Sequence, residues 1–129
     1  MNIVNLTPHP IVLVGSETMG TVPSSGVCRV ACTPGTLTHV PGIPVPVAEP
    51  TTFGAIEGLP SPVDGTVFIV SGMVASALVS QGVRNRPDVL VPGTGPQDGA
   101  VRDAEGRIVG VTRLVRAVPD PLVLHVPRT

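Results

Sequence analysis

The chain of 129 residues contains no Lys, Trp or Tyr, and its only aromatic residues are Phe53 and Phe68. So few aromatic rings leave little surface on which single-stranded nucleic acid could stack its bases. The net charge of −1 provides no basic field that would attract a phosphate backbone. We therefore expect no nucleic-acid partner.

Cysteines and long apolar runs are also scarce. Cys28 and Cys32 are the only cysteines, and on one strand they would lie roughly 13 Å apart, too far for a disulfide. Two isolated cysteines do not form a zinc site, and no metal site is expected elsewhere. No apolar run has the length of a membrane span, and the opening MNIVNLTPH lacks the pattern of a signal peptide. We expect free thiols, no membrane segment and a soluble protein in the cytoplasm.

Valine, 15 glycines and 16 prolines dominate what is present, and this composition predicts short strands joined by tight turns. Pro8 and Pro10 prevent regular pairing between the first two strands, which we expect to form a bent or offset pair. The predicted strands are residues 2–6, 10–14, 18–22, 27–33, 36–40, 43–47, 51–57, 66–70, 88–91, 100–103, 107–115 and 122–126. Pro44 and Pro46 confine residues 43–47 to an edge strand or to an extended, unpaired arm.

The stretch from Asp64 to Pro92 predicts a strand, a helix and a second strand. Residues 66–70 are almost continuously apolar, as in a strand that is covered on both faces. Ser71 is a favourable N-cap and Gly82 a favourable C′ residue, so the helix should span about residues 71–81. The spacing resembles a crossover unit, which makes the flanking strands parallel. We predict a single domain over residues 1–129, mainly β (α+β), built as a small β-barrel or a two-layer sheet with one central helix.

The positions of the arginines suggest where an anionic ligand would bind. Seven of the eight arginines follow Gly82. Arg84 and Arg86 could hold a phosphate, although Arg86 could instead pair with Asp88. We add Arg102 and Arg113 to the candidate ligand-binding residues. Arg113 should share a strand face with valines, where a charge needs a partner or a ligand.

Five further candidates lie in turns and at the helix start. Ser71 and Gly72 would present free N–H groups and a partial positive charge to an anion, while Ser71 also has a structural role as the N-cap. Thr7 and His9 lie in a stiff bend beside two prolines, where they could contact a ligand or satisfy backbone groups. Thr94 lies in a loop of small residues.

No motif for catalysis appears in the sequence. The segment IVSGM lacks the GxSxG pattern of a nucleophile elbow, and PGTGPQDG is not a glycine-rich phosphate loop. We therefore predict no catalytic residue and no cofactor.

Four segments resemble a family of small proteins from tailed-phage and actinobacterial genomes: NLTPH at Asn5–His9, IVS at Ile69–Ser71, RPDVLVP at Arg86–Pro92, and AVRDAEGRIVGVTRLV at Ala100–Val115. The resemblance implies a viral setting, and hence the cytoplasm of a bacterial host. Phage proteins of this size include sponges that sequester the cyclic nucleotide signals of bacterial immunity and are homo-oligomers.

The leading hypothesis is a non-enzymatic phage protein that binds a small anionic, nucleotide-like ligand, such as a cyclic nucleotide or cyclic ADP-ribose immune signal, and forms a homo-oligomer. One alternative is a virion or assembly accessory protein that docks through its proline-rich arm at Val40–Pro50. Another is a small hydrolase or lyase acting on a phosphorylated ligand, with His9 as the acid or base.

Overall fold

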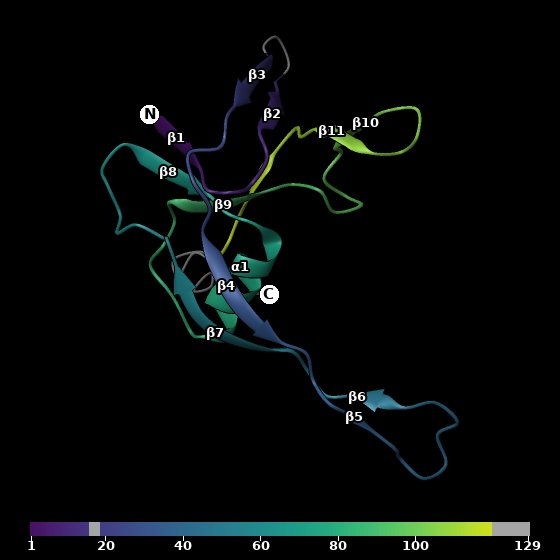
Figure 1. Ribbon diagram of the computed structural model, residues 1–129. Helices are drawn as coiled ribbons and strands as arrows, with labels where there is room; N and C mark the ends of the chain where they lie inside the picture. The colour runs from purple at the N-terminus through teal and green to yellow at the C-terminus, as the bar shows by residue number, and fades with distance from the viewer. Residues whose placement is uncertain (16–18, 120–129) are drawn as a thin grey trace, which may run out of the picture.

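The computed structural model describes residues 1–15 and 19–119, and a four-stranded sheet lies at its centre (Figure 1). Three neighbouring strands of this sheet are parallel, and the fourth runs antiparallel to them. Their order is β1 (Asn2–Asn5), β8 (Thr66–Ile69), β9 (Val89–Pro92) and β12 (Leu114–Arg116).

The helix α1 (Gly72–Ser80) connects β8 to β9, so the predicted strand–helix–strand unit with parallel strands is confirmed. Ser71 is the N-cap, because its Oγ accepts a hydrogen bond from the Val74 N–H at 3.3 Å. Gly82 follows the helix with a φ of +75°, a conformation that glycine adopts without steric cost.

Both faces of the central sheet are covered. Phe68 and Val70 pack with Val74 and Leu78 of α1, whereas Ile69, between them in the chain, belongs to a separate cluster with Ile11 and Val111. Because neighbouring residues of a strand point to opposite faces, this division explains why β8 is apolar at successive positions. Each of these apolar side chains contributes about 1.5–3 kcal/mol through its burial.

Four antiparallel strand pairs surround this centre (Figure 1). The pairs are β4 (Arg29–Thr33) with β7 (Thr52–Glu57), β5 (Leu37–Thr38) with β6 (Val47–Ala48), β2 (Ile11–Val14) with β3 (Met19–Val22), and β10 (Val101–Arg102) with β11 (Ile108–Gly110). Both strands of the β4–β7 pair pack against α1. The β5–β6 pair extends from the far end of β4–β7 as a projecting arm.

The predicted mainly β fold with one helix is confirmed. Of the two architectures predicted for it, the small barrel is wrong, because residues 1–15 and 19–119 form several small sheets and no closed barrel. The first two strands do not pair regularly, as predicted, but the predicted bent or offset pair does not form either. β1 pairs with β8 and β2 with β3, because the bend at Thr7–Pro10 sends the chain out of the central sheet.

Residues 107–115 do not form one strand as predicted. β11 ends at Gly110, Val111 forms a bridge with Leu13, and β12 begins at Leu114 in the central sheet. This break places Arg113 outside any strand, so the valine-lined strand face expected around it does not exist. The chain breaks here because Val111 enters the cluster with Ile11 and Ile69, while the Arg113 carbonyl accepts the Gly93 N–H.

Two further predicted strands, residues 43–47 and 122–126, are considered next to the described strands. Of residues 43–47 only Val47 belongs to a strand, because Pro44 and Pro46 lack the N–H that a ladder requires. The predicted strand at residues 122–126 lies outside the described residues.

Both cysteines are free, as predicted. Cys28 is buried and Cys32 half-buried, and burial raises the pKa of the Cys28 thiol. In the described part of the chain, α1 is too short to cross a membrane.

Candidate functional site

Three segments that follow parallel strands meet at one edge of the central sheet. β1, β8 and β9 run in the same direction, so their carboxyl ends lie at the same edge. The Thr7–Pro10 bend follows β1, Ser71 and Gly72 follow β8, and the loop at residues 93–98 follows β9. In open parallel sheets, ligands bind in the crevice outside the carboxyl ends of the strands.

Asn5 holds the bend after β1. Its side chain is fully buried, and its Oδ1 accepts hydrogen bonds from the Thr7 N–H at 2.9 Å and the Thr7 hydroxyl at 2.6 Å. Its Nδ2 donates to the carbonyls of His9 at 2.8 Å and Val22 at 3.0 Å. Ser24 adds a bond from its hydroxyl to the Thr7 carbonyl. These contacts fix the backbone that carries His9, whose side chain is exposed.

The start of α1 forms the second wall of the site. The Val74 N–H is capped by Ser71, and the N–H groups at the first positions of a helix point out of it without intrahelical acceptors. Gly72 is exposed, and a Cβ placed on it would meet no atom within 4 Å. A ligand can therefore approach this backbone closely.

The loop at residues 93–98 forms the third wall, and Asp98 organises it. The Asp98 carboxylate is largely buried and accepts the Gly95 N–H at 2.8 Å. Arg113 donates from Nη2 to the Gln97 carbonyl at 2.7 Å, and its Nε lies 3.7 Å from Asp98 Oδ1. Thr112 donates its hydroxyl to the Asp98 carbonyl at 3.0 Å. The chain after β11 thus anchors the loop that borders the site.

These three walls enclose a cleft of about 560 Å³. It brings together five of the residues predicted from the sequence, namely Thr7, His9, Ser71, Gly72 and Thr94. Apolar surface comes from Pro8, Ile11, Val91, Pro92 and Val115, and the remaining polar lining comes from Gly95 and Asp98. The volume is in the range of sites for small molecules, which are typically apolar with a few convergent polar groups.

The four predicted arginines do not line this cleft. Arg84 and Arg86 follow the opposite end of α1, and Arg102 lies in β10, where it donates to the Gly106 carbonyl at 2.8 Å. Arg113 lies nearest, behind the Asp98 loop. Arg86 forms two bonds of 3.0 Å to Asp88 and one of 2.9 Å to the Pro60 carbonyl, so the alternative pairing with Asp88 is confirmed.

Sequence reasoning missed two residues that shape the site. Asn5 appears in the sequence only within the NLTPH motif, although an Asn just before a Thr-Pro bend is a common organiser of turns through its side chain. In the sequence, Asp98 stands in PGTGPQDG, where an Asp is typical of a turn. Its burial depends on Arg113 and Thr112, which are 15 and 14 residues away in the chain, so no local signal marks it.

Gly93 is expected to be essential for the geometry of the loop. A Cβ at this position would lie 2.8 Å from both the Cγ and the carbonyl oxygen of Arg113 and 3.2 Å from the Asp98 Cβ. We expect Gly93→Ala to lower the free energy of unfolding by about 1–3 kcal/mol, as overpacking does. Urea denaturation measures the change. Gly20→Ala is the control, because its Cβ would meet nothing within 4 Å; equal losses in both variants would contradict the prediction.

Within residues 1–15 and 19–119, no group of three or more His, Cys, Asp or Glu side chains is placed to hold a metal ion. Comparison of the chain with models of known protein families, with curated proteins and with solved structures found no match. The chain is thus described by its own fold and site: a small α+β domain with a ligand-sized cleft at the carboxyl edge of a parallel sheet.

Proposed function

We propose that this protein binds a small anionic, nucleotide-like ligand in the cleft and does not transform it. The observation that carries the proposal is the convergence of Thr7, His9, Ser71, Gly72 and Thr94 on one cleft at the start of α1. These residues come from three separate segments, and the fold brings them together.

One end of the cleft is suited to an anionic group. The free N–H groups at the start of α1 and the partial positive charge of the helix favour a phosphate there. Gly72 leaves the approach open. The exposed His9 side chain lines the same cleft and offers a further donor.

The Asp98 loop is suited to hydrogen-bond donors of the ligand. The Asp98 carboxylate lines the cleft and can accept bonds from a sugar hydroxyl or a base amine, as can the Thr94 hydroxyl. Pro8, Pro92 and Val91 supply apolar walls for the rest of the ligand. Neither phenylalanine lines the cleft, so binding would rely on hydrogen bonds and apolar contact without aromatic stacking.

The charges at the cleft favour a ligand with few phosphate charges. No arginine within residues 1–15 and 19–119 lines it, and Asp98 adds a negative charge. A cyclic phosphodiester with one charge per phosphate fits this balance better than a nucleoside triphosphate does. A cyclic nucleotide or cyclic ADP-ribose signal of bacterial immunity, which the likeness to small phage proteins suggests, belongs to this class.

Calorimetry against cyclic mononucleotides, cyclic dinucleotides and cyclic ADP-ribose isomers tests the proposal, with the corresponding nucleosides as uncharged controls. We expect one of the phosphorylated compounds to bind, its nucleoside to bind more weakly, and mass spectrometry to recover the ligand unchanged from the denatured complex. Absence of binding at tens of micromolar across this panel would contradict the proposal, and recovery of a cleaved product would show an enzyme.

Gly72→Leu should block the cleft while leaving the fold intact, because a side chain at this position extends into open space. Loss of one hydrogen bond to a charged group costs about 1.5–3 kcal/mol, so we expect affinity to fall at least about tenfold. Ser76→Leu is the matched control, since Ser76 is exposed on the same helix and outside the cleft. Calorimetry with the ligand found in the panel measures both variants, and equal affinities would place the ligand elsewhere.

A further inference from the structure

The β5–β6 arm is an exposed, uncharged projection. From Thr33 to Thr52 no residue is buried, and residues 34–48 contain no Asp, Glu, Lys or Arg. Leu37 and Val45 are 69% and 60% exposed. At the base of the arm, Glu49 donates its N–H to Thr36, and a Cβ on Gly35 would overlap the Glu49 carbonyl. The sequence therefore specifies this hairpin closely while leaving its apolar side chains in water.

A partner would stabilise such an arm. A two-stranded hairpin alone is at best marginally stable in water, and exposed apolar side chains in a row mark an interaction surface. Pro44 and Pro46 prevent the tip from adding to a sheet edge, because they cannot donate to a ladder. The tip IPVPV is therefore suited to inserting side chains into an apolar groove, as extended proline-rich segments do.

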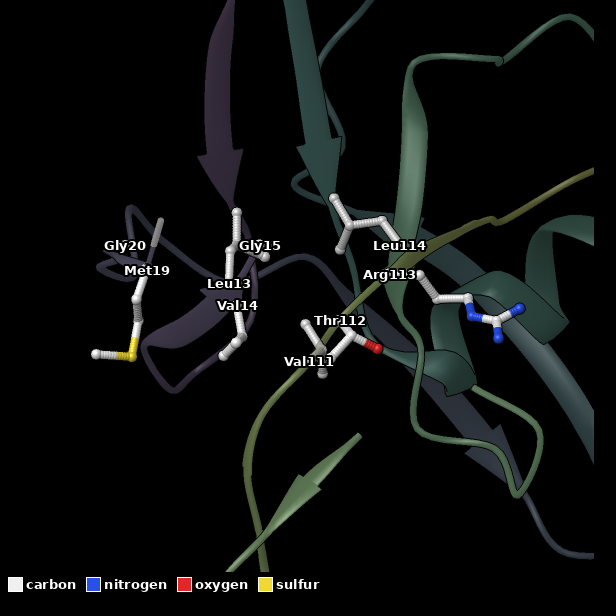
Figure 2. Close-up of a pocket in the computed structure, with 9 residues that line it drawn as sticks. All are labelled: Leu13, Val14, Gly15, Met19, Gly20, Val111, Thr112, Arg113 and Leu114. Carbon is white, nitrogen blue, oxygen red and sulfur yellow. The ribbon is translucent and has the colours of Figure 1, made fainter. Parts of the chain in front are cut away.

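The same chain also has a groove lined by apolar side chains, which suits the apolar side chains of the arm. It has a volume of about 440 Å³ and lies between the β2–β3 hairpin and the chain before β12. Figure 2 shows its apolar lining, with Leu13, Val14 and Met19 on one side and Val111 and Leu114 on the other. Among the lining residues that the structure describes, Arg113 is the only charged one, and its guanidinium points away from these side chains toward the Gln97 carbonyl.

The arm of a chain does not reach its own groove. In Figure 1 the arm projects from one end of the molecule, while the β2–β3 hairpin lies at the opposite end. We propose that the arm of one copy of this protein seats in the groove between β2–β3 and Val111–Leu114 of a second copy. One contact then covers the apolar side chains of both the arm and the groove, and the absence of Asp, Glu, Lys and Arg from residues 34–48 matches the apolar lining of the groove. This arm exchange is independent of what the cleft binds.

Native mass across protein concentrations, with one variant on each side of the contact, tests the proposal. We expect the wild-type protein to be an oligomer at tens of micromolar. Val45→Glu on the arm and Met19→Glu in the groove should each shift the mass to that of a monomer, since a charge would enter an apolar contact. Met19 is 76% exposed, so neither substitution disturbs the core. Val63→Glu, at a 55% exposed position in the loop before β8, is the control and should leave the oligomer intact.

Mixing the two variants distinguishes arm exchange from any other contact. The Val45→Glu protein keeps an intact groove and the Met19→Glu protein keeps an intact arm, so an equimolar mixture should form a heterodimer that neither forms alone. A symmetric contact of groove with groove would give no such rescue. A monomeric wild-type protein at tens of micromolar, or a mixture that stays monomeric, would overturn the proposal.

Discussion

Asn5→Ala should be the most destabilising substitution outside the apolar core, and we expect it to lower the free energy of unfolding by about 3–5 kcal/mol. Asn5 is fully buried and forms four hydrogen bonds to Thr7, His9 and Val22. Alanine would leave the Thr7 N–H and the two carbonyls without these partners. A buried polar group without a partner costs about 1–3 kcal/mol, and this applies to the buried Thr7 N–H. The His9 carbonyl keeps the bond from the Thr7 hydroxyl at 3.0 Å, and each of the other lost hydrogen bonds adds about 0.5–1.5 kcal/mol. Urea denaturation monitored by circular dichroism measures the loss.

Asn2→Ala is the matched control, because Asn2 lies on the same strand with an exposed side chain. We expect it to change stability by less than about 0.5 kcal/mol. Asn5→Ala should also weaken ligand binding at the cleft, since the bend that carries Thr7 and His9 loses its anchor. An Asn5→Ala protein within 1 kcal/mol of wild type, on the order of a single ordinary hydrogen bond, would show that the bend does not depend on this side chain.

Arg86→Ala should have the second largest effect, a loss of about 2–3 kcal/mol, because hydrogen bonds to charged groups contribute more than neutral ones. Both partners of the Arg86–Asp88 pair are mostly buried, with side chains 15% and 13% exposed. The substitution would also remove the bond that ties the loop before β9 to Pro60. Arg84→Ala is the control, since Arg84 is exposed and, within the described part of the chain, its side chain bonds only to the carbonyl of Val83, its neighbour in the chain.

The same pair should make stability depend on pH in the acid range. Hydrogen bonds from Arg86 hold the pKa of Asp88 below its ordinary value. The unfolded chain therefore binds a proton at a higher pH than the folded protein does. The stabilisation is complete above the unfolded pKa of about 3.9 and is lost as the pH falls through the lower folded-state pKa. Urea denaturation between pH 2 and pH 6 should show a shallower dependence for Arg86→Ala, and parallel curves would contradict this assignment.

Local patterns account for the part of the fold that could be predicted. The α1 boundaries follow from Ser71 and Gly82, and β8 follows from its apolar run, because a cap, a C′ glycine and a buried strand each have a short-range signature. The break at residues 111–113 could not be predicted in this way. The segment reads as one continuous strand, and only its competing contacts with Leu13 and Gly93 divide it.

The candidate site was predictable to the extent that its residues follow strands. Thr7, Ser71 and Thr94 each come shortly after one of three parallel strands, and the shared direction of these strands brings them to one edge. The arginines were candidates for the site because of their charge, but the charge of a side chain does not determine where the fold places it. Arg86 instead pairs with Asp88, two residues away.

The sequence by itself determined a mainly β chain with one helix between parallel strands, two free thiols and a rigid proline-flanked bend, because each depends on residues close together in the chain. Only the tertiary structure decided that β1 joins β8, that Asn5 and Asp98 shape a cleft, and that the arm and the apolar groove lie at opposite ends of the molecule. These features depend on contacts between residues far apart in sequence, whose pairing is chosen by the packing of the whole core and by the burial of its polar groups.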